Sequence, residues 1–301
     1  MKFSIKVPAT TANLGPGFDC LGLALPIYNT ITVEETVMPG TGIEINIIDE
    51  TNEMDVLSIP TDENNIVYKA IEMLYNSIGQ TPSELKITIN TQIPVARGLG
   101  SSASVIVGGL LAANELLGRP ADEAALLSIA AEIEGHPDNS TPAILGGFVL
   151  SSLEEDGSVV YRKLNFPKDW NITVCIPDYE LATNIARSVI PDEIPIRDAL
   201  FNLKRSAMLI QAVNTADKEL MKYALQDKIH QPYREKLIPG LKEIKEALKH
   251  EENVLGVVLS GAGPSVLIIS YGNNLDKIRK TVSDVWDGLN VKSDILTLPV
   301  E

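Results

Sequence analysis

Hydrophobic and polar positions alternate along the first half of the chain with two different periods. A period of two, typical of strands with one buried face, recurs in residues 3–8, 30–35, 43–48 and 85–93. Apolar residues at helical spacing predict helices over residues 66–78, 103–117 and 122–134. Gly118 and Gly135 directly follow the last two helices and are typical C-terminal stop signals. The first half therefore mixes strands with helices.

The second half begins after an acidic turn at residues 154–157. We place a boundary there and expect one domain over residues 1–155 and another over residues 156–301. β-rich runs predict strands over residues 172–177, 254–260, 266–270 and 292–298. Helical spacing predicts helices over residues 196–214, 218–225, 240–250 and 275–289. This β-α-β-β-α-β order is the split-βαβ, ferredoxin-like arrangement with helical insertions, so the expected fold class is α+β.

Composition limits the class of protein and its partners. A chain of 301 residues with 45% hydrophobic and 22% charged residues is typical of a globular protein with two domains. The net charge of −15 and the pI near 4.7 argue against nucleic acid or an anionic membrane as a partner. No apolar run is long enough for a signal peptide or a membrane span, and we expect a cytoplasmic protein. Cys20 and Cys175 lack metal-ligand spacing and are interpreted as reduced packing residues.

A glycine-rich turn that leads into the helix predicted over residues 103–117 is the most informative segment for function. Gly98 and Gly100 leave backbone N–H groups open to an incoming anion, and the following helix offers its unpaired N–H groups and its dipole to the same place. Serine hydroxyls add further donors. The turn therefore predicts a phosphate-binding site. Its residues are Pro94, Val95, Ala96, Arg97, Gly98, Leu99, Gly100, Ser101, Ser102, Ala103 and Ser104.

Three other interpretations compete for this turn. A P-loop requires a lysine after its last glycine, and none follows Gly100. The dinucleotide fingerprint fits Gly98, Gly100 and Ala103. It also requires an acid at the end of a strand about 20 residues on, whereas Asp122 and Glu123 open a helix here. The plainest alternative is a glycine-rich helix entrance that binds no ligand.

Two further glycine-bearing segments, residues 8–19 and 259–265, accompany the central turn. Together the three segments resemble the motifs of the superfamily of galactokinases, homoserine kinases, mevalonate kinases and phosphomevalonate kinases. The central Pro-x-x-x-Gly-Leu-Gly-Ser-Ser-Ala is highly specific for that superfamily. The resemblance implies that the turn binds ATP, that the N-terminal domain is similar to ribosomal protein S5 and that the C-terminal domain is ferredoxin-like.

Residues 9–19, 135–139 and 231–240 are similar to the homoserine kinases within this superfamily. The implied reaction transfers a phosphoryl group from ATP to L-homoserine and gives O-phospho-L-homoserine, the step that commits carbon to threonine. The resemblance also implies Mg²⁺ and a homodimer. A kinase for another alcohol, such as mevalonate, and a non-catalytic sensor on the same scaffold are the alternative functions. Turnover of ATP with several alcohols would separate them.

The resemblance assigns residues to the zwitterionic substrate. Arg187 and Arg234 match arginines that bind the carboxylate, for which a planar guanidinium is suited. The residues that match the rest of the substrate site are Asn13, Asp19, His136, Asn139, Thr183 and Gly261. Thr183 is expected near the reacting hydroxyl. Plainer explanations are surface ion pairs for the arginines, hydrogen-bonded turns for the loop residues and solvent exposure for the threonine.

For the nucleotide, the central turn is expected to wrap the phosphates, and Asn65 resembles a residue that lies near the adenine. Mg²⁺ keeps most of its waters and needs few protein ligands. Ser102, or Ser101, together with Glu134 are the expected ligands. Because the segment after Glu134 is shorter than in some relatives, Glu132 is the alternative ligand.

The predicted catalytic residues are Asn139, Thr183 and Arg187, none of which is a strong base. Many relatives carry an aspartate where this chain has Asn139, and an amide cannot accept the hydroxyl proton. Phosphoryl transfer depends mainly on alignment and charge neutralisation. We therefore expect no single carboxylate to be indispensable, with Asp138 and Asp19 as the alternative bases.

Overall fold

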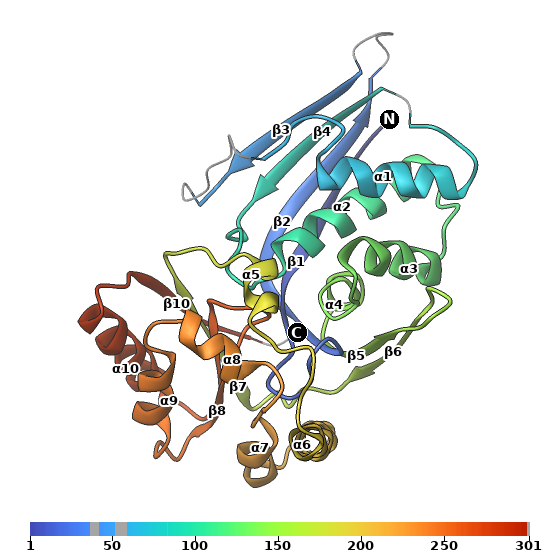
Figure 1. Ribbon diagram of the computed structural model, residues 1–301. Coiled ribbons are helices and arrows are strands. Elements are labelled where there is room, and N and C mark those ends of the chain that lie inside the picture. The colour runs from blue at the N-terminus through green and yellow to red at the C-terminus, as the bar shows by residue number, and fades with distance from the viewer. Residues whose placement is uncertain (37–41, 52–58, 83, 300–301) are drawn as a thin grey trace.

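Two β-sheets, one in each half of the chain, form the framework of the protein (Figure 1). The computed structural model describes residues 1–36, 42–51, 59–82 and 84–299. Within these ranges the fold is mixed α+β, as the hydrophobic pattern predicts. Among the described helices, none has both the length and the apolar character to cross a membrane.

The first sheet has the strand order β3-β4-β2-β5-β6 within the described ranges, with β1 paired on β2. The strands are β1 Lys2–Ala12, β2 Leu21–Glu35, β3 Ile43–Asp49, β4 Leu85–Thr91, β5 Phe148–Leu153 and β6 Val159–Leu164. β3 and β4 are parallel, and the other neighbours are antiparallel. The loop between β1 and β2 contacts the second half of the chain, where Asn13 Nδ2 donates to Gly261 O.

β1 and β2 extend beyond the strands predicted at residues 3–8 and 30–35. Residues 9–12 and 21–23 are buried without interruption. Helices pack on one face of these strands, and hydrophobic residues of the second half pack on the other. A strand that is buried on both faces shows no alternation, so the sequence pattern could not reveal these residues as strand.

Four helices lie on one face of the first sheet (Figure 1). They are α1 Ile66–Ser77, α2 Ser101–Leu116, α3 Glu123–Glu134 and α4 Ser140–Leu145. α2 lies closest to β1 and β2, and most of its residues are buried. Gly108 permits this approach, since a Cβ there would lie 2.7 Å from Ile31 Cδ1. The sheet thus holds α2 in place, and the glycine-rich turn leads into the N-terminal end of this helix.

The second sheet is antiparallel, with the order β10-β7-β9-β8. Its strands are β7 Trp170–Pro177, β8 Val254–Leu259, β9 Val266–Tyr271 and β10 Ser293–Leu298. One face packs against α6 Ile196–Thr215 and α7 Lys218–Ala224, and the other packs against α9 Leu241–Leu248 and α10 Leu275–Gly288. The connections contain α5 Thr183–Ser188, α8 Gln231–Arg234 and the 3-10 helix η2 Glu235–Leu237. The predicted β-α-β-β-α-β order is confirmed.

The acidic turn at residues 154–157 joins two neighbouring strands of the first sheet. β5 and β6 pair on either side of it, from Phe148 with Leu164 to Leu153 with Val159. The expected boundary between residues 155 and 156 therefore divides a hairpin. By sheet membership the first half extends through β6 and the second begins at β7, because a polar hairpin turn has the same composition as a linker.

One hydrophobic core joins the two sheets. It contains Leu23 and Phe148 from the first sheet, Val174 from the second, Leu209 from α6 and Leu225 just after α7. α6 and α7 therefore pack against both halves of the chain. This shared core holds the two halves in a fixed relation around the site.

Both cysteines are free thiols. Burial, with Asp138 and Asp19 nearby, raises the pKa of Cys20 to about 11. Burial also raises the pKa of Cys175, which lies in the core of β7. Both thiols are therefore protonated at neutral pH, in keeping with their interpretation as packing residues.

Candidate active site

A cavity of about 410 Å³ lies where the two halves of the chain meet. The first half lines it with the loop between β1 and β2, the turn before α2 and the loop between α3 and α4. The second half adds the first residue of α5, Arg187 and Arg234, and the loop between β8 and β9. The three glycine-bearing segments of the sequence thus meet around one space.

The turn before α2 has the geometry of an anion cradle. Gly98 and Gly100 have φ angles of +74° and +65°, in the left-handed region that glycine tolerates. A Cβ on Gly98 would lie 2.2 Å from Ser260 O, and one on Gly100 would lie 1.9 Å from Thr10 Oγ1. Gly100 is the N-cap of α2 and no side chain caps that end. The N–H groups of the first turn are therefore open to an anion.

Only part of the predicted nucleotide-binding turn faces the cavity. Residues 94–102 line it, whereas Ala103 and Ser104 are buried beneath it. Ser104 Oγ donates to Ser101 O and accepts from Asn29 Nδ2. Ala103 and Ser104 thus anchor the start of α2 without facing the cavity, because the helix turns them into the core.

Arg97 uses its side chain to hold the turn in place. Its Nη1 donates to Val95 O at 3.3 Å, and its Nη2 donates to Asp178 O, just after β7, at 3.1 Å. Arg97 is also buried. Its guanidinium therefore links the cradle to the second half of the chain.

Asn65 lies outside the cavity. Its Oδ1 accepts from Val67 N and so caps α1, and its Nδ2 donates to Pro60 O. Its neighbour Ile66 does line the cavity. Asn65 therefore caps α1, and the next residue along the chain faces the cavity. Thr183, the first residue of α5, is exposed and lines the cavity.

A hydroxyl and a carboxylate meet at the edge of the cradle. Ser102 Oγ donates to Glu134 Oε1 at 2.7 Å. Burial raises the pKa of Glu134, although the Ser102 hydrogen bond and His136 oppose this effect. Glu132, on the same helix, is exposed and does not line the cavity. Oxygen donors of this kind fit Mg²⁺, which would take its remaining ligands from phosphates and water.

Within the described ranges, no group of three or more His, Cys, Asp or Glu side chains could hold a metal ion. Any cation at Ser102 and Glu134 would therefore depend on phosphate oxygens as well as on the protein.

Charged side chains of both signs also line the cavity. Arg187 Nη1 and Nη2 donate to Asp19 Oδ2 and Oδ1 at 3.0 and 2.8 Å, a two-pronged ion pair. Phe18 contacts both arginines, since the guanidinium carbons of Arg187 and Arg234 are each 5.3 Å from its ring centroid. Such cation–π contacts favour the charged form of both arginines. Phe18 is a site residue that the sequence analysis missed.

Arg234 is almost fully buried. Its Nε donates to Ala186 O at 3.0 Å, and its Nη1 donates to Gly261 O at 3.3 Å. Burial, and then the neighbouring charge of Arg187, lower the pKa of Arg234 to about 10. The side chain is therefore still a cation at neutral pH, and its hydrogen bonds to the two carbonyl groups fix it beside the cavity.

Asn13 shapes the loop that carries Asp19. Its Nδ2 donates to Gly261 O at 2.8 Å, and its Oδ1 accepts from Asp19 N at 3.0 Å. The φ angles of Asn13 and Asp19, +71° and +57°, are both in the left-handed region. The hydrogen-bonded turn expected for these residues is therefore present, and both residues also line the cavity.

Hydrogen bonds link three side chains beside the cavity, Thr10, Asn139 and Asp138, and His136 forms an ion pair with the same aspartate. Thr10 Oγ1 donates to Asn139 Oδ1 at 2.9 Å, Asn139 Nδ2 donates to Asp138 Oδ1 at 3.2 Å, and His136 Nδ1 lies 2.7 Å from the same Asp138 oxygen. Asp138 is only 2% exposed. Burial tends to lower the pKa of His136, but Asp138, with Glu134 and Asp19, outweighs it and raises the pKa to about 9. His136 is therefore an imidazolium at neutral pH.

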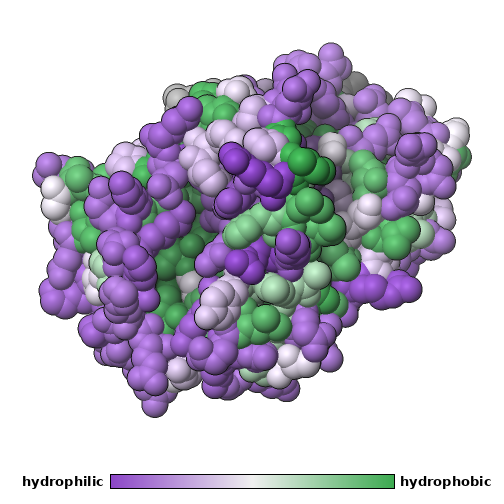
Figure 2. Space-filling view, turned by 60° about the horizontal axis from the view of Figure 1, so that its bottom comes forward, coloured by the Kyte–Doolittle hydropathy of each residue, from purple (hydrophilic) through white to green (hydrophobic). Residues whose placement is uncertain are grey.

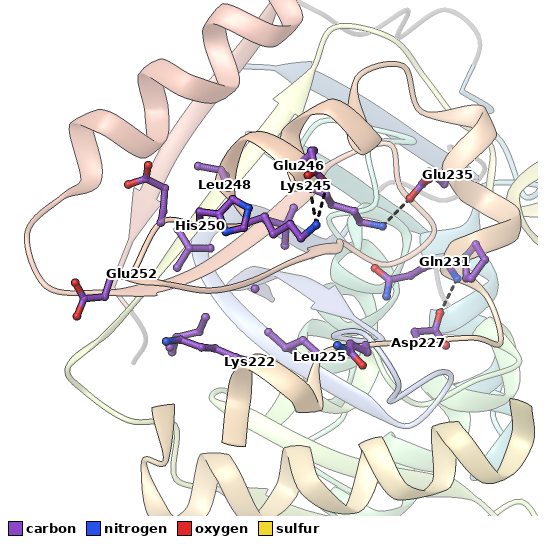
Figure 3. Close-up of a pocket in the computed structure, with 18 residues that line it drawn as sticks. Lys222, Leu225, Asp227, Gln231, Glu235, Lys245, Glu246, Leu248, His250 and Glu252 are labelled. Carbon is purple, nitrogen blue, oxygen red and sulfur yellow. Dashed lines mark hydrogen bonds and ion pairs between the residues drawn. The ribbon is translucent and has the colours of Figure 1, made fainter. Parts of the chain in front are cut away.

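A second cavity of about 690 Å³ lies within the second half, between α7, α9 and β8 (Figure 3). It is larger than the first, but two of its lysines are paired with two of its glutamates, Lys245 with Glu235 at 2.8 Å and Lys249 with Glu246 at 3.3 Å. None of the predicted site residues lines it. The smaller first cavity, which the predicted site residues line, is therefore the candidate active site.

Two family models match the chain. The model of the GHMP kinases N terminal domain matches residues 65–147, and the model of the GHMP kinases C terminal matches residues 208–288. The first match contains the cradle and Glu134. The second contains Arg234 and the loop between β8 and β9.

Similar proteins cover nearly the whole chain. The homoserine kinase of Caldicellulosiruptor saccharolyticus is 43% identical, over 99% of this chain and 94% of the relative. The crystal structure of homoserine kinase from Cytophaga hutchinsonii superposes with a TM-score of 0.88 at 30% identity, covering 99% of this chain and 95% of that one. A Streptococcus pneumoniae phosphomevalonate kinase, in complex with phosphomevalonate and AMPPNP, has a TM-score of 0.72 at 16% identity. It covers 98% of this chain and 100% of that one, and it shows a shared fold alone.

Proposed function

The chain belongs to the homoserine kinases of the GHMP kinase family, and from this premise we propose how its cavity carries out the reaction. It is a small-molecule kinase that transfers the terminal phosphoryl group of ATP to the side-chain hydroxyl of L-homoserine. The product, O-phospho-L-homoserine, is an intermediate of threonine biosynthesis. The observation that supports this mechanism best is the Arg187–Asp19 ion pair, which lines the same cavity as the glycine cradle.

The zwitterionic end of homoserine binds where the cavity carries both charges. Its carboxylate takes hydrogen bonds from Arg187 and Arg234, because planar guanidinium groups match a carboxylate in geometry and charge. Its ammonium lies against Asp19, and Asn13 and Gly261 hold that side of the pocket. The rest of the molecule then extends past Thr183 and His136 toward the cradle.

The phosphates of ATP bind to residues 94–102. Backbone N–H groups and the N-terminal end of α2 offset their negative charge, which a chain of net charge −15 otherwise repels. Ser102 and Glu134 would hold Mg²⁺. A bound Mg²⁺ supplies charge neutralisation at the transferred phosphoryl group.

The side chains near the acceptor hydroxyl align it and stabilise charge. Asn139 is fixed by its hydrogen bonds to Thr10 and Asp138, so its amide has a defined orientation. Asp138 is buried and already engaged by His136 and Asn139. Arg187 and the His136 imidazolium add positive charge near the reacting groups. Preorganised charge of this kind lowers the barrier of phosphoryl transfer without a dedicated strong base.

Turnover of ATP with L-homoserine, mevalonate, galactose and shikimate tests this function. ADP should form with homoserine, and chelation of Mg²⁺ should stop the reaction. ADP that forms with one of the other alcohols and never with homoserine would transfer the chain to another branch of the family.

We assign the first half to the ribosomal protein S5-like fold and the second half to the ferredoxin-like fold, a name that the order β10-β7-β9-β8 supports.

We also propose a cytoplasmic location, which cell fractionation would test, and a homodimer. Ile196, Leu200 and Leu203 form an exposed apolar stripe on α6. The face in Figure 2 is largely hydrophilic, with separate hydrophobic patches. A monomeric mass in sedimentation would refute the dimer.

Replacement of Arg187 by alanine should weaken homoserine binding and leave ATP binding almost unchanged. A hydrogen bond to a charged group contributes about 1.5–3 kcal/mol, so the KM for homoserine should rise about 10- to 100-fold. Steady-state kinetics with each substrate varied in turn measure this effect. Arg197→Ala is the control, since Arg197 is an exposed arginine on α6. A normal homoserine KM in Arg187→Ala would remove Arg187 from the site.

In the proposed mechanism Asp138 is not the general base, whose loss typically costs about 10²–10⁴-fold in rate. Replacement of Asp138 by asparagine should therefore lower turnover at saturating substrates by well under about 100-fold. Asp138 raises the pKa of His136 to about 9, so its loss should lower that pKa and move the alkaline limb of the pH–rate profile to lower pH.

Asp19→Asn should act chiefly on homoserine affinity. A loss of about 10³-fold in either variant would identify that aspartate as the base.

A further inference from the structure

A buried histidine that has no part in the proposed mechanism, His230, lies directly behind the substrate arginines. It immediately precedes α8 and has no exposed surface. Its ring stacks on Phe18, with the centroids 4.9 Å apart and the planes 15° apart. Its Nε2 lies 2.7 Å from Gly15 O, and its Nδ1 lies 3.2 Å from Arg234 Nη1. One ring thus contacts the loop between β1 and β2 and the guanidinium of Arg234.

The two partners determine where the ring carries its hydrogen. Gly15 O can only accept, so Nε2 must donate to it. Arg234 Nη1 can only donate, so Nδ1 must offer its lone pair. Asp227 Oδ2, at 3.4 Å from Nε2, is another acceptor on the same side. Burial lowers the pKa of His230, although Asp227 opposes this effect, which agrees with a neutral ring.

Hydrogen bonds to Asp227 also hold the backbone at His230 in place. Asp227 Oδ2 accepts from His230 N at 3.1 Å and from Gln231 N at 2.6 Å. Asp227 Oδ1 accepts from Asn202 Nδ2, on α6, at 2.7 Å. Asp227 and Gln231 lie at one end of the second cavity (Figure 3). The His230 ring therefore has a defined place between α6 and the reaction cavity.

We infer that His230 is a positioning residue, whose neutral ring orients the Arg234 guanidinium toward the homoserine carboxylate and ties it to the loop that carries Asp19. Ala186 O and Gly261 O accept two of the other Arg234 hydrogen bonds. Among these acceptors around the Arg234 guanidinium, His230 is the side chain, and its Nδ1 completes the hydrogen bonds that orient the guanidinium. The inference rests on the proposed function, because that function assigns Arg234 to the carboxylate.

Two substitutions separate the two contacts of the ring. In His230→Asn the amide oxygen can take the place of Nδ1 and accept from Arg234, whereas the contact with Gly15 is lost. In His230→Gln the amide nitrogen can take the place of Nε2 and donate to Gly15 O, whereas the acceptor at Nδ1 is lost. Because the lost bond involves a charged group, we expect the homoserine KM to rise about 10-fold in His230→Gln and less than about threefold in His230→Asn.

The ATP KM should stay unchanged in both variants, and the exposed His250→Gln serves as the control. Equal rises of the homoserine KM in the two variants, or a parallel rise of the ATP KM, would overturn the inference and leave the proposed function standing. A wild-type chain that does not phosphorylate homoserine would overturn both. Nitrogen NMR of the wild-type histidines gives a test that no variant's folding affects. A hydrogen on Nδ1 of His230 at neutral pH would also refute the inference.

Discussion

Replacement of Gly100 by alanine is expected to lower kcat/KM for ATP by about 100-fold or more, because a displacement of about an ångström in a catalytic site has a cost of this order. The added Cβ would lie 1.9 Å from Thr10 Oγ1 and 3.0 Å from Asn139 Oδ1. Thr10 Oγ1 also donates to Asn139 Oδ1. The clash therefore disturbs the cradle and the acceptor side of the cavity together. Steady-state kinetics with ATP varied at saturating homoserine measure the loss.

Gly118→Ala is a matched control for this substitution. Gly118 follows the C-terminal end of the same helix, α2, with a φ of +76°, but a Cβ there would meet nothing within 4 Å. Both variants place alanine in the left-handed region and carry similar backbone strain. Only Gly100→Ala should lose activity. Equal kinetics in the two variants would mean that the turn does not bind the phosphates.

Glu134→Gln is expected to lower turnover by about 10²–10³-fold, the usual cost of removing one preorganised group that stabilises transition-state charge. The substitution keeps the shape of the side chain and an acceptor for Ser102, whose hydroxyl lies 2.7 Å away. It removes only the negative charge. The Mg²⁺ concentration that gives half-maximal rate should rise at the same time, and titration of Mg²⁺ at saturating ATP and homoserine measures this shift.

Glu132→Gln is the control for the metal site. Glu132 lies two residues earlier on α3 and is exposed outside the cavity. Its loss should leave both turnover and the Mg²⁺ requirement unchanged. If Glu132→Gln carries the loss and Glu134→Gln does not, the metal belongs to the alternative ligand that the sequence also allows.

The regular elements were predictable where one face of an element is buried. The strand predicted at residues 85–93 corresponds to β4, Leu85–Thr91, whose alternate residues are buried. Residues 9–12 and 21–23 were not predictable as strand, because burial on both faces removes the alternation. The turn at residues 154–157 was taken for a boundary, because a hairpin turn and a linker favour the same polar residues.

The site was predictable where its chemistry requires a local run of residues. The cradle needs glycines and a helix start within one short segment, and the sequence displays both. Phe18 and His230 have no such pattern, since one aromatic ring and one histidine acquire a role only from neighbours that are distant in sequence. His230 and Gly15, for example, are separated by 215 positions. The opposite holds for Asn65 and Ser104, which match the family pattern but face the interior.

The hydrophobic core that α6 and α7 share with both sheets couples the folding of the two halves. Opening one half would expose Leu23 and Phe148 on one side and Val174 on the other to water. Neither half can then melt alone without losing part of its own interior, so the chain should denature in a single cooperative transition. The cavity exists only while both halves are folded. Each substrate that binds there therefore acts as a thermal stabiliser of the entire chain.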